Sequence, residues 1–137
     1  MKASVLQTRL LEALQARDLI ETLETLTEEL MGDGLELSAV NTILHFFEEH
    51  PDVDFGMPGP LVHFVEQAYG AGYESELIQS VTRQPTKHTT WMLNRVINGT
   101  KNAQERVKLI DVMRLVVSHP RADVETKQQA AHFLTRL

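Results

Sequence analysis

The fold of this chain is decided by residues 54–98, DFGMPGPLVHFVEQAYGAGYESELIQSVTRQPTKHTTWMLNRVIN. The stretch holds three of the five prolines, both tyrosines and the only tryptophan. Gly59-Pro60 predicts the start of a helix, because proline at the first helical position gives up only an N–H group that has no partner within the helix. In the remainder of this stretch, glycine, proline and capping side chains mark where helices begin and end. Three successive helices are predicted: one from Pro60 to Gly70 and Gly72, a short one at 77–81 that stops before Pro85, and one from the cap Thr86 to Asn98-Gly99.

The flanking sequence predicts five more helices, from apolar residues at three- and four-residue spacing and from capping side chains. The first covers residues 2–17 and has the apolar stripe Leu6, Leu10, Ala13 and Leu14. The second is capped by Asp18 and ends at Gly32 and Gly34. The third covers residues 39–49, with Ser38 as its cap and Pro51 just after its end. Residues 50–58 form a loop. The last two are a helix from Asn102 to His119-Pro120, expected to be the most buried, and one capped by Asp123 with the stripe Ala130, Ala131, Leu134 and Leu137.

These elements predict an all-α protein of about eight helices with short connections, because no period-2 alternation or hairpin signal is present. With 137 residues, one domain covering 1–137 can bury roughly two-thirds of its unfolded surface. Successive helices of this length suggest antiparallel hairpins stacked in a short HEAT-like solenoid. An irregular helical bundle is the alternative, since no sequence repeat marks the solenoid period.

The composition narrows the chemistry. The chain contains no cysteine, so it has no disulfide framework, thiolate metal site or cysteine nucleophile. The N-terminal segment MKASVLQTRLLEALQARD lacks the uninterrupted run of about seven apolar residues found in a signal peptide, and no run approaches the roughly 20 residues of a membrane span. We therefore expect a cytoplasmic protein without a membrane partner.

The formal net charge of −6 is unevenly distributed. Residues 1–79 carry 15 Asp and Glu against 3 Lys and Arg, a charge of −12, whereas residues 80–137 carry 4 against 10, a charge of +6. A surface dominated by negative charge repels nucleic acid and attracts basic proteins. We therefore expect a basic protein partner and no nucleic acid.

Two pairs of residues raise the question of a metal site. His45 with Glu49, and His63 with Glu66, have the spacing that places both side chains on one helix face. Two side chains do not make a metal site, and the sequence contains neither an H-E-x-x-H motif nor the E-x-x-H pair of di-iron bundles. We expect neither a metal nor another cofactor.

One enzyme alternative remains open. A hydrolase could use His63 with Glu66 and Arg83 or Arg95, provided that these side chains converge in a pocket. The sequence lacks a Gly-rich phosphate loop and a nucleophile elbow. A protein that is not an enzyme is therefore the favoured interpretation.

A polar series with an aromatic residue follows the helix that Thr86 caps. With Pro60 and His63 of the predicted helix that begins at Pro60, the candidate strip is Pro60, His63, Arg83, Trp91, Asn94 and Arg95, and Asn98 continues the same helix face. They could form a second binding strip, because tryptophan and arginine are frequent anchors of interfaces. The structural interpretation is favoured, since a tryptophan flanked by helix-core residues is usually core; Asn94 and Arg95 would then bond carbonyl groups of the 54–60 loop.

Seven acidic residues of the N-terminal half are the candidates for contact with a basic partner. They are Glu21, Glu24, Glu28, Glu48, Glu49, Asp52 and Asp54. Each alone could be ordinary solvated surface, but a charge of −12 over 79 residues exceeds what solubility requires of a small domain. The loop carboxylates Asp52 and Asp54 are favoured because a loop held beside a helix end is accessible to a partner.

Two segments resemble a known family. The runs PGPLVHFVE (58–66) and RQPTKHTTWMLNRVIN (83–98) resemble small α-helical immunity proteins encoded beside the toxin domains of bacterial polymorphic and contact-dependent growth inhibition systems. The resemblance implies a cytoplasmic, non-enzymatic protein that binds one cognate toxin, often a basic nuclease, and blocks its active site or its access to substrate. The family pattern does not supply the contact residues, so the seven acidic residues are derived from charge.

The expected function is therefore an immunity protein that neutralises a cognate toxin domain by occupying it. A helical scaffold or adaptor that binds a peptide or another subunit is the alternative. The toxin, the manner of binding and the oligomeric state stay open.

Overall fold

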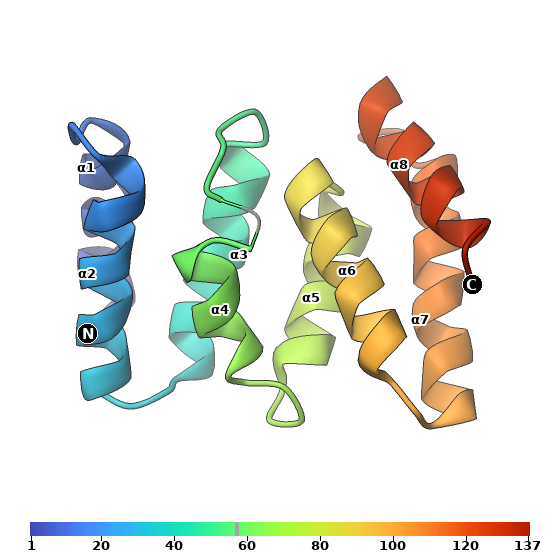
Figure 1. The fold of residues 1–137 in the computed structure, drawn as a ribbon, viewed down its shortest axis with the longest axis horizontal. Helices are drawn as coiled ribbons and strands as arrows, with labels where there is room; N and C mark the ends of the chain where they lie inside the picture. Colours follow the sequence, from blue (N-terminus) through green and yellow to red (C-terminus); the bar gives the residue numbers. More distant parts are fainter. Residues whose placement is uncertain (57) are drawn as a thin grey trace. The chain divides into compact units, whose positions relative to one another are not determined.

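The structure, a computed structural model, describes residues 1–56 and 58–137. Within those residues it contains eight α-helices and no strand, which confirms the all-α prediction (Figure 1). The helices are α1 (Ala3–Leu14), α2 (Leu19–Gly32), α3 (Leu37–Glu49), α4 (Pro60–Glu66), α5 (Tyr73–Arg83), α6 (Lys87–Gly99), α7 (Ala103–Val117) and α8 (Val124–Leu134). Met57, in the predicted loop 50–58, lies outside the described residues.

The chain divides into two compact units. Unit 1 comprises Met1–Phe46 and Asp52–Tyr73, and unit 2 comprises Phe47–Pro51 and Glu74–Leu137. Of the three boundaries, one falls inside α3, one follows Pro51, and one follows Tyr73, the first residue of α5. The single domain 1–137 and the HEAT-like stacking stay predictions.

In unit 1, α2 packs against both α1 and α4 (Figure 1). The segment that leads into α4 and away from it lies along α3. At one end of α3 the rings of Phe46 and Phe55 are 5.2 Å apart. At the other end a Cβ atom on Gly72 would lie 2.7 Å from the Leu37 side chain. The chain from 55 to 72 therefore runs antiparallel to α3.

The connection between α1 and α2 is longer than predicted, because α1 ends at Leu14 and α2 begins at Leu19. Asp18 caps α2 as expected, with Oδ1 accepting a hydrogen bond from Glu21 N at 3.1 Å. The prediction of a helix over 2–17 is wrong at its end, because α1 stops at Leu14. The N–H groups of Gln15 and Ala16 bond carbonyls three residues back, and this tight turn lets Asp18 adopt the extended conformation that an N-cap needs.

The predicted cap of α3 is also wrong. Helix α3 begins at Leu37, so Ser38 lies inside its first turn. The carbonyl oxygen of Glu36 accepts from Ala39 N at 3.1 Å and from Val40 N at 3.3 Å, and these bonds start the helix two residues earlier than a Ser38 cap would. The Ser38 hydroxyl instead lies 3.4 Å from the Glu36 carboxylate.

The start of α4 is as predicted, with Pro60 in the first turn after the extended N-cap Gly59. A Cβ atom on Gly59 would lie 1.7 Å from Phe55 O, which is far inside van der Waals contact. Only glycine therefore lets the chain pass close to Phe55 before α4 begins.

In unit 2, helices α6, α7 and α8 pack against one another (Figure 1). The predicted caps are confirmed: Asn102 accepts from Glu105 N at 3.0 Å, Asp123 accepts from Thr126 N at 2.7 Å, and Thr86 forms a reciprocal capping box with Thr89. The end of α5 is bonded to the α7–α8 connection, since the ring of His119 lies 2.7 Å from Thr82 O.

The prediction that α7 is the most buried helix is wrong. Only Leu109, Met113 and Val116 are buried on it, whereas Val107 and Leu115 are 56% and 57% exposed. Helix α7 contacts α6 and α8 through one stripe, so apolar residues outside that stripe remain in solvent. The predicted stripe of α8 fails for the same reason: Ala130 is buried, but Ala131 and Leu137 are exposed and Leu134 is half-buried.

Among the residues described, no helix combines the length and the hydropathy that a membrane span requires.

Candidate functional site

One side of α2 carries a row of carboxylates, called here the α2 strip and consisting of Glu21, Glu24 and Glu28. The buried residues of α2 are Leu23, Leu26, Thr27 and Leu30. With about 100° between successive residues, the strip follows a face beside that buried stripe. All three carboxylates are exposed, and none forms an ion pair within the described part of the chain. The α2 strip is therefore an uncompensated negative surface.

Two acidic residues outside the α2 strip, Glu29 of α2 and its C-cap Asp33, are paired with positive groups. Arg9 of α1 donates two hydrogen bonds to Glu29, from Nη1 to Oε2 at 3.0 Å and from Nη2 to Oε1 at 3.2 Å. These bonds hold the pKa of the Glu29 carboxyl below its usual value. The N-terminal ammonium group is paired in the same way with Asp33 at 3.1 Å. Arg9 and the N-terminal ammonium group are thus engaged with carboxylates outside the α2 strip.

The two units differ in formal charge, although by less than residues 1–79 and 80–137 do. Unit 1 contains 11 acidic and 3 basic side chains, a formal charge of −8, and unit 2 contains 8 acidic and 10 basic side chains, a formal charge of +2. The negative surface of this protein is therefore a property of unit 1.

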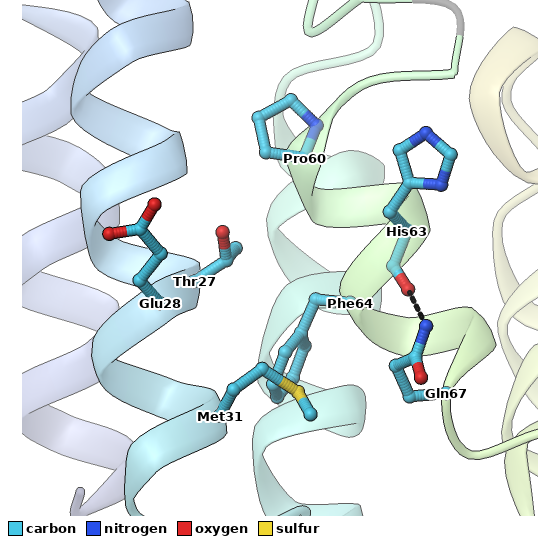
Figure 2. Close-up of a pocket in the computed structure, with 7 residues that line it drawn as sticks. All are labelled: Thr27, Glu28, Met31, Pro60, His63, Phe64 and Gln67. Carbon is cyan, nitrogen blue, oxygen red and sulfur yellow. Dashed lines mark hydrogen bonds between the residues drawn. The ribbon is translucent and has the colours of Figure 1, made fainter.

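An apolar groove of 460 Å³ lies beside the α2 strip, between α2 and α4 (Figure 2). Figure 2 shows the Met31 side chain reaching from α2 toward Phe64 of α4. Met31 is 47% exposed and Phe64 is buried, and Glu28 stands at the rim. The residues that line the groove are Thr27, Glu28, Met31, Pro60, His63, Phe64 and Gln67. Its volume lies in the range of about 300–1,000 Å³ that is typical of binding sites.

The loop carboxylates Asp52 and Asp54 are both exposed, as predicted for accessible loop residues. Asp54 Oδ1 accepts a hydrogen bond from Gly56 N at 2.9 Å, which orders the loop. A Cβ atom on Gly56 would lie 3.7 Å from Ile20 Cδ1. The loop therefore lies against the first turn of α2, at the end of the α2 strip that begins with Glu21.

Glu48 does not belong to this exposed surface. Its carboxylate accepts from Arg83 Nε at 2.8 Å, from Arg83 Nη2 at 2.7 Å and from Ser80 Oγ at 2.8 Å, all within unit 2. The Glu48 side chain is only 7% exposed, and its hydrogen bond raises the pKa of Arg83. The structure thus places Glu48 in an internal ion pair, while its neighbour Glu49 is exposed.

The residues of the predicted second strip are divided between the units. Pro60 and His63 belong to unit 1 and line the groove. In unit 2, Trp91 is half-buried rather than a core residue, and the guanidinium carbon of Arg95 lies 5.0 Å above its ring, a cation–π contact. Asn94 is half-buried on the same helix; its bond to the 54–60 loop stays a prediction.

The residues considered for a metal site or for a hydrolase have the following surroundings in the structure. In the part of the chain that the structure describes, no three His, Asp or Glu side chains are grouped so that they could hold a metal ion. Of the two arginines in the hydrolase alternative, Arg83 is bonded to Glu48 and Arg95 lies over Trp91. His63 is exposed at the groove.

Sequence reasoning missed four lining residues of the groove, namely Thr27, Met31, Phe64 as a lining residue, and Gln67. One signal could have identified Met31. It lies seven residues after Glu24 and three after Glu28, so a large apolar side chain shares the face of the α2 strip.

Comparison of this chain with protein-family models, with curated proteins and with solved structures gives no match.

Proposed function

We propose that this protein is an inhibitor of the immunity-protein type, which binds a basic toxin domain through the acidic face of unit 1 and blocks that toxin by occupancy. The observation that carries the proposal is the uncompensated α2 strip beside an apolar groove. Glu21, Glu24 and Glu28 supply the charge, and Asp52 and Asp54 extend it at one end. Glu49 is a further exposed acid of unit 2.

The two parts of this face have different tasks in binding. Opposite charge accelerates the encounter of two proteins, and the formal charge of −8 on unit 1 suits a basic partner. Slow dissociation needs a few desolvated anchors instead of more charge. The groove between α2 and α4 offers a place for such an anchor.

An occluding inhibitor also needs a stiff surface, because a flexible one loses entropy on binding. The α2 strip stands on a helix that is capped by Asp18 and anchored by three buried leucines. Arg9 of α1 bonds Glu29 on another side of that helix. The carboxylates are therefore presented on a fixed backbone.

Co-expression tests the proposal. If the neighbouring open reading frame encodes a toxin domain, this chain should restore growth of cells that express it. The variant Glu24→Lys/Glu28→Lys should lower the affinity for the purified toxin by about tenfold at low salt, mainly through slower association, and should reduce the salt dependence of binding. The control Glu12→Lys changes an exposed acid of α1 and should have a much smaller effect.

Equal affinity of the Glu24→Lys/Glu28→Lys variant and the unchanged protein would remove the α2 strip from the proposal. Failure to restore growth beside any encoded toxin would remove the proposed function itself.

A scaffold or adaptor function is the second candidate, and the groove also favours it, since its volume suits a peptide side chain. The two functions differ in the partner. An adaptor should capture a defined cellular protein in cells that lack a neighbouring toxin gene, whereas an inhibitor of the immunity-protein type should capture its toxin.

A further inference from the structure

We infer that the groove between α2 and α4 takes one apolar side chain from a basic segment of the partner protein, and that a Lys or Arg of the same segment bonds Glu28 and Glu24. The inference rests on the proposed function and adds the chemistry of the recognised segment. An exposed segment in which apolar and cationic side chains alternate would have the required character.

The interior of the groove is apolar. Met31 and Phe64 face each other across it, and Pro60 adds a further apolar surface (Figure 2). Methionine is unbranched and polarizable, so it adapts to apolar side chains of different shape. Because Met31 is 47% exposed without a partner, an apolar side chain placed against it would remove its surface from water.

Two polar side chains of the groove, Thr27 and Gln67, already donate a hydrogen bond to a nearby backbone carbonyl. Thr27 Oγ1 donates to Glu24 O at 3.0 Å, and Gln67 Nε2 donates to His63 O at 3.3 Å. The Thr27 hydroxyl has a single hydrogen and would have to break this bond to donate to a polar ligand, and one of the two N–H groups of Gln67 is already used. The groove therefore favours an apolar group over a polar one.

The charge around the groove selects a cationic segment. Neither α2 nor α4 contains a single Lys or Arg, so no cation of either wall competes for the carboxylates. Glu28 lies in the groove lining and Glu24 one turn before it. The apolar stem of a Lys or Arg can lie along Met31 while its charged end reaches these carboxylates. An acidic segment would be repelled.

Three synthetic peptides of equal length test the inference by isothermal titration with the full chain: one that alternates Lys and Leu, one that alternates Lys and Ser, and one that alternates Glu and Leu. We expect measurable binding of the Lys/Leu peptide only. Met31→Gln keeps the length of the side chain but removes its apolar end, and Glu28→Gln removes the charge with little change in shape. Each should weaken the Lys/Leu peptide by about five- to tenfold.

The controls are Leu115→Gln, at an exposed apolar position of α7 in unit 2, and Glu12→Gln, at an exposed acid of α1. Both should leave the affinity unchanged within about twofold. Circular dichroism verifies that each variant is folded. Equal binding of the Lys/Leu and Lys/Ser peptides would overturn the apolar part of the inference. Self-association of the chain that Met31→Gln abolishes would assign the groove to a second copy and would also overturn it.

The inference and the proposed function can fail separately. If the chain restores growth but Met31→Gln and Glu28→Gln bind the toxin as well as the unchanged protein, the groove inference fails and the function stands. If the peptide results are as expected but no toxin is neutralised, the proposed function fails and the groove remains a site for a basic segment.

Discussion

Replacing Arg83 by methionine should destabilise this protein by about 3 kcal/mol, near the lower end of the range for breaking a buried ion pair. The Glu48 side chain is 7% exposed, and its carboxylate accepts two hydrogen bonds from Arg83, at 2.8 and 2.7 Å. Arg83→Met removes both of these charged donors from the buried carboxylate, while the hydrogen bond from Ser80 Oγ remains. The lower end applies because the Arg83 side chain is 36% exposed, so water can partly replace it.

The complementary variant, Glu48→Gln, should lower the free energy of unfolding by less than Arg83→Met does. Glu48→Gln leaves an acceptor for one of the donors and removes the buried charge, while Arg83 can be solvated by water. We expect a loss of about 1.5–2 kcal/mol, the worth of a charged hydrogen bond. The double variant Glu48→Gln/Arg83→Met should be more stable than Arg83→Met alone, because it contains no uncompensated buried charge.

Urea unfolding followed by circular dichroism measures all three variants, and the thermal midpoint of Arg83→Met should fall by about 10 °C. The control is Arg114→Met, since Arg114 and Asp111 pair at 2.8 Å with side chains that are 65% and 61% exposed; it should change the free energy of unfolding by less than about 0.5 kcal/mol. The reasoning would be refuted if Arg83→Met were as stable as the control. It would also be refuted if the loss in free energy of unfolding of the double variant equalled the sum of the two single losses.

Three further predictions concern backbone contact, pH and packing. Gly59→Ala should destabilise by about 3 kcal/mol or more, because its Cβ would lie 1.7 Å from Phe55 O; Gly32→Ala, with no atom within 4 Å of its Cβ, should be neutral or slightly stabilising in urea unfolding. The hydrogen bonds that Asp123 accepts from Thr126 lower the pKa of its carboxyl, so the stability it contributes should be present at neutral pH and lost as the pH falls below the usual value of 3.8. Asp123→Ala should remove about 1 kcal/mol at pH 7 and flatten this acid dependence in unfolding curves recorded from pH 7 to 3. Met113→Ala, at a fully buried site of α7, should cost about 2–5 kcal/mol in thermal or urea unfolding, whereas Leu115→Ala, at a site 57% exposed, should stay within about 0.5 kcal/mol of the unchanged protein.

Helix boundaries were predictable where the deciding contact is local. Asp18, Thr86, Asn102 and Asp123 each bond an N–H group three residues ahead, so the residues within one turn contain the whole interaction. Ser38 shows the limit of this reasoning, since the carbonyl of Glu36 started α3 earlier. A cap is reliable only where no earlier residue can begin the helix.

The site was less predictable, because its residues are selected by contacts distant in the sequence. Glu48 and Glu49 are adjacent and chemically alike, yet Arg83 buries one of them and the other is exposed. The groove likewise requires α2 and α4 to pack side by side. The periodicity of α2 indicates which residues leave its buried stripe, but it does not indicate which neighbour stands opposite them.

The sequence by itself determined the helical class, most helix limits and the excess of negative charge. Helix propensity and capping depend only on residues close in the sequence, and net charge depends on no contact at all. Only the tertiary structure decided which carboxylates are paired, how much of α7 is exposed, and that Met31 and Phe64 enclose a groove. Burial and ion pairing depend on which side chains meet in space, and many placements of the same helices would satisfy the same periodicity.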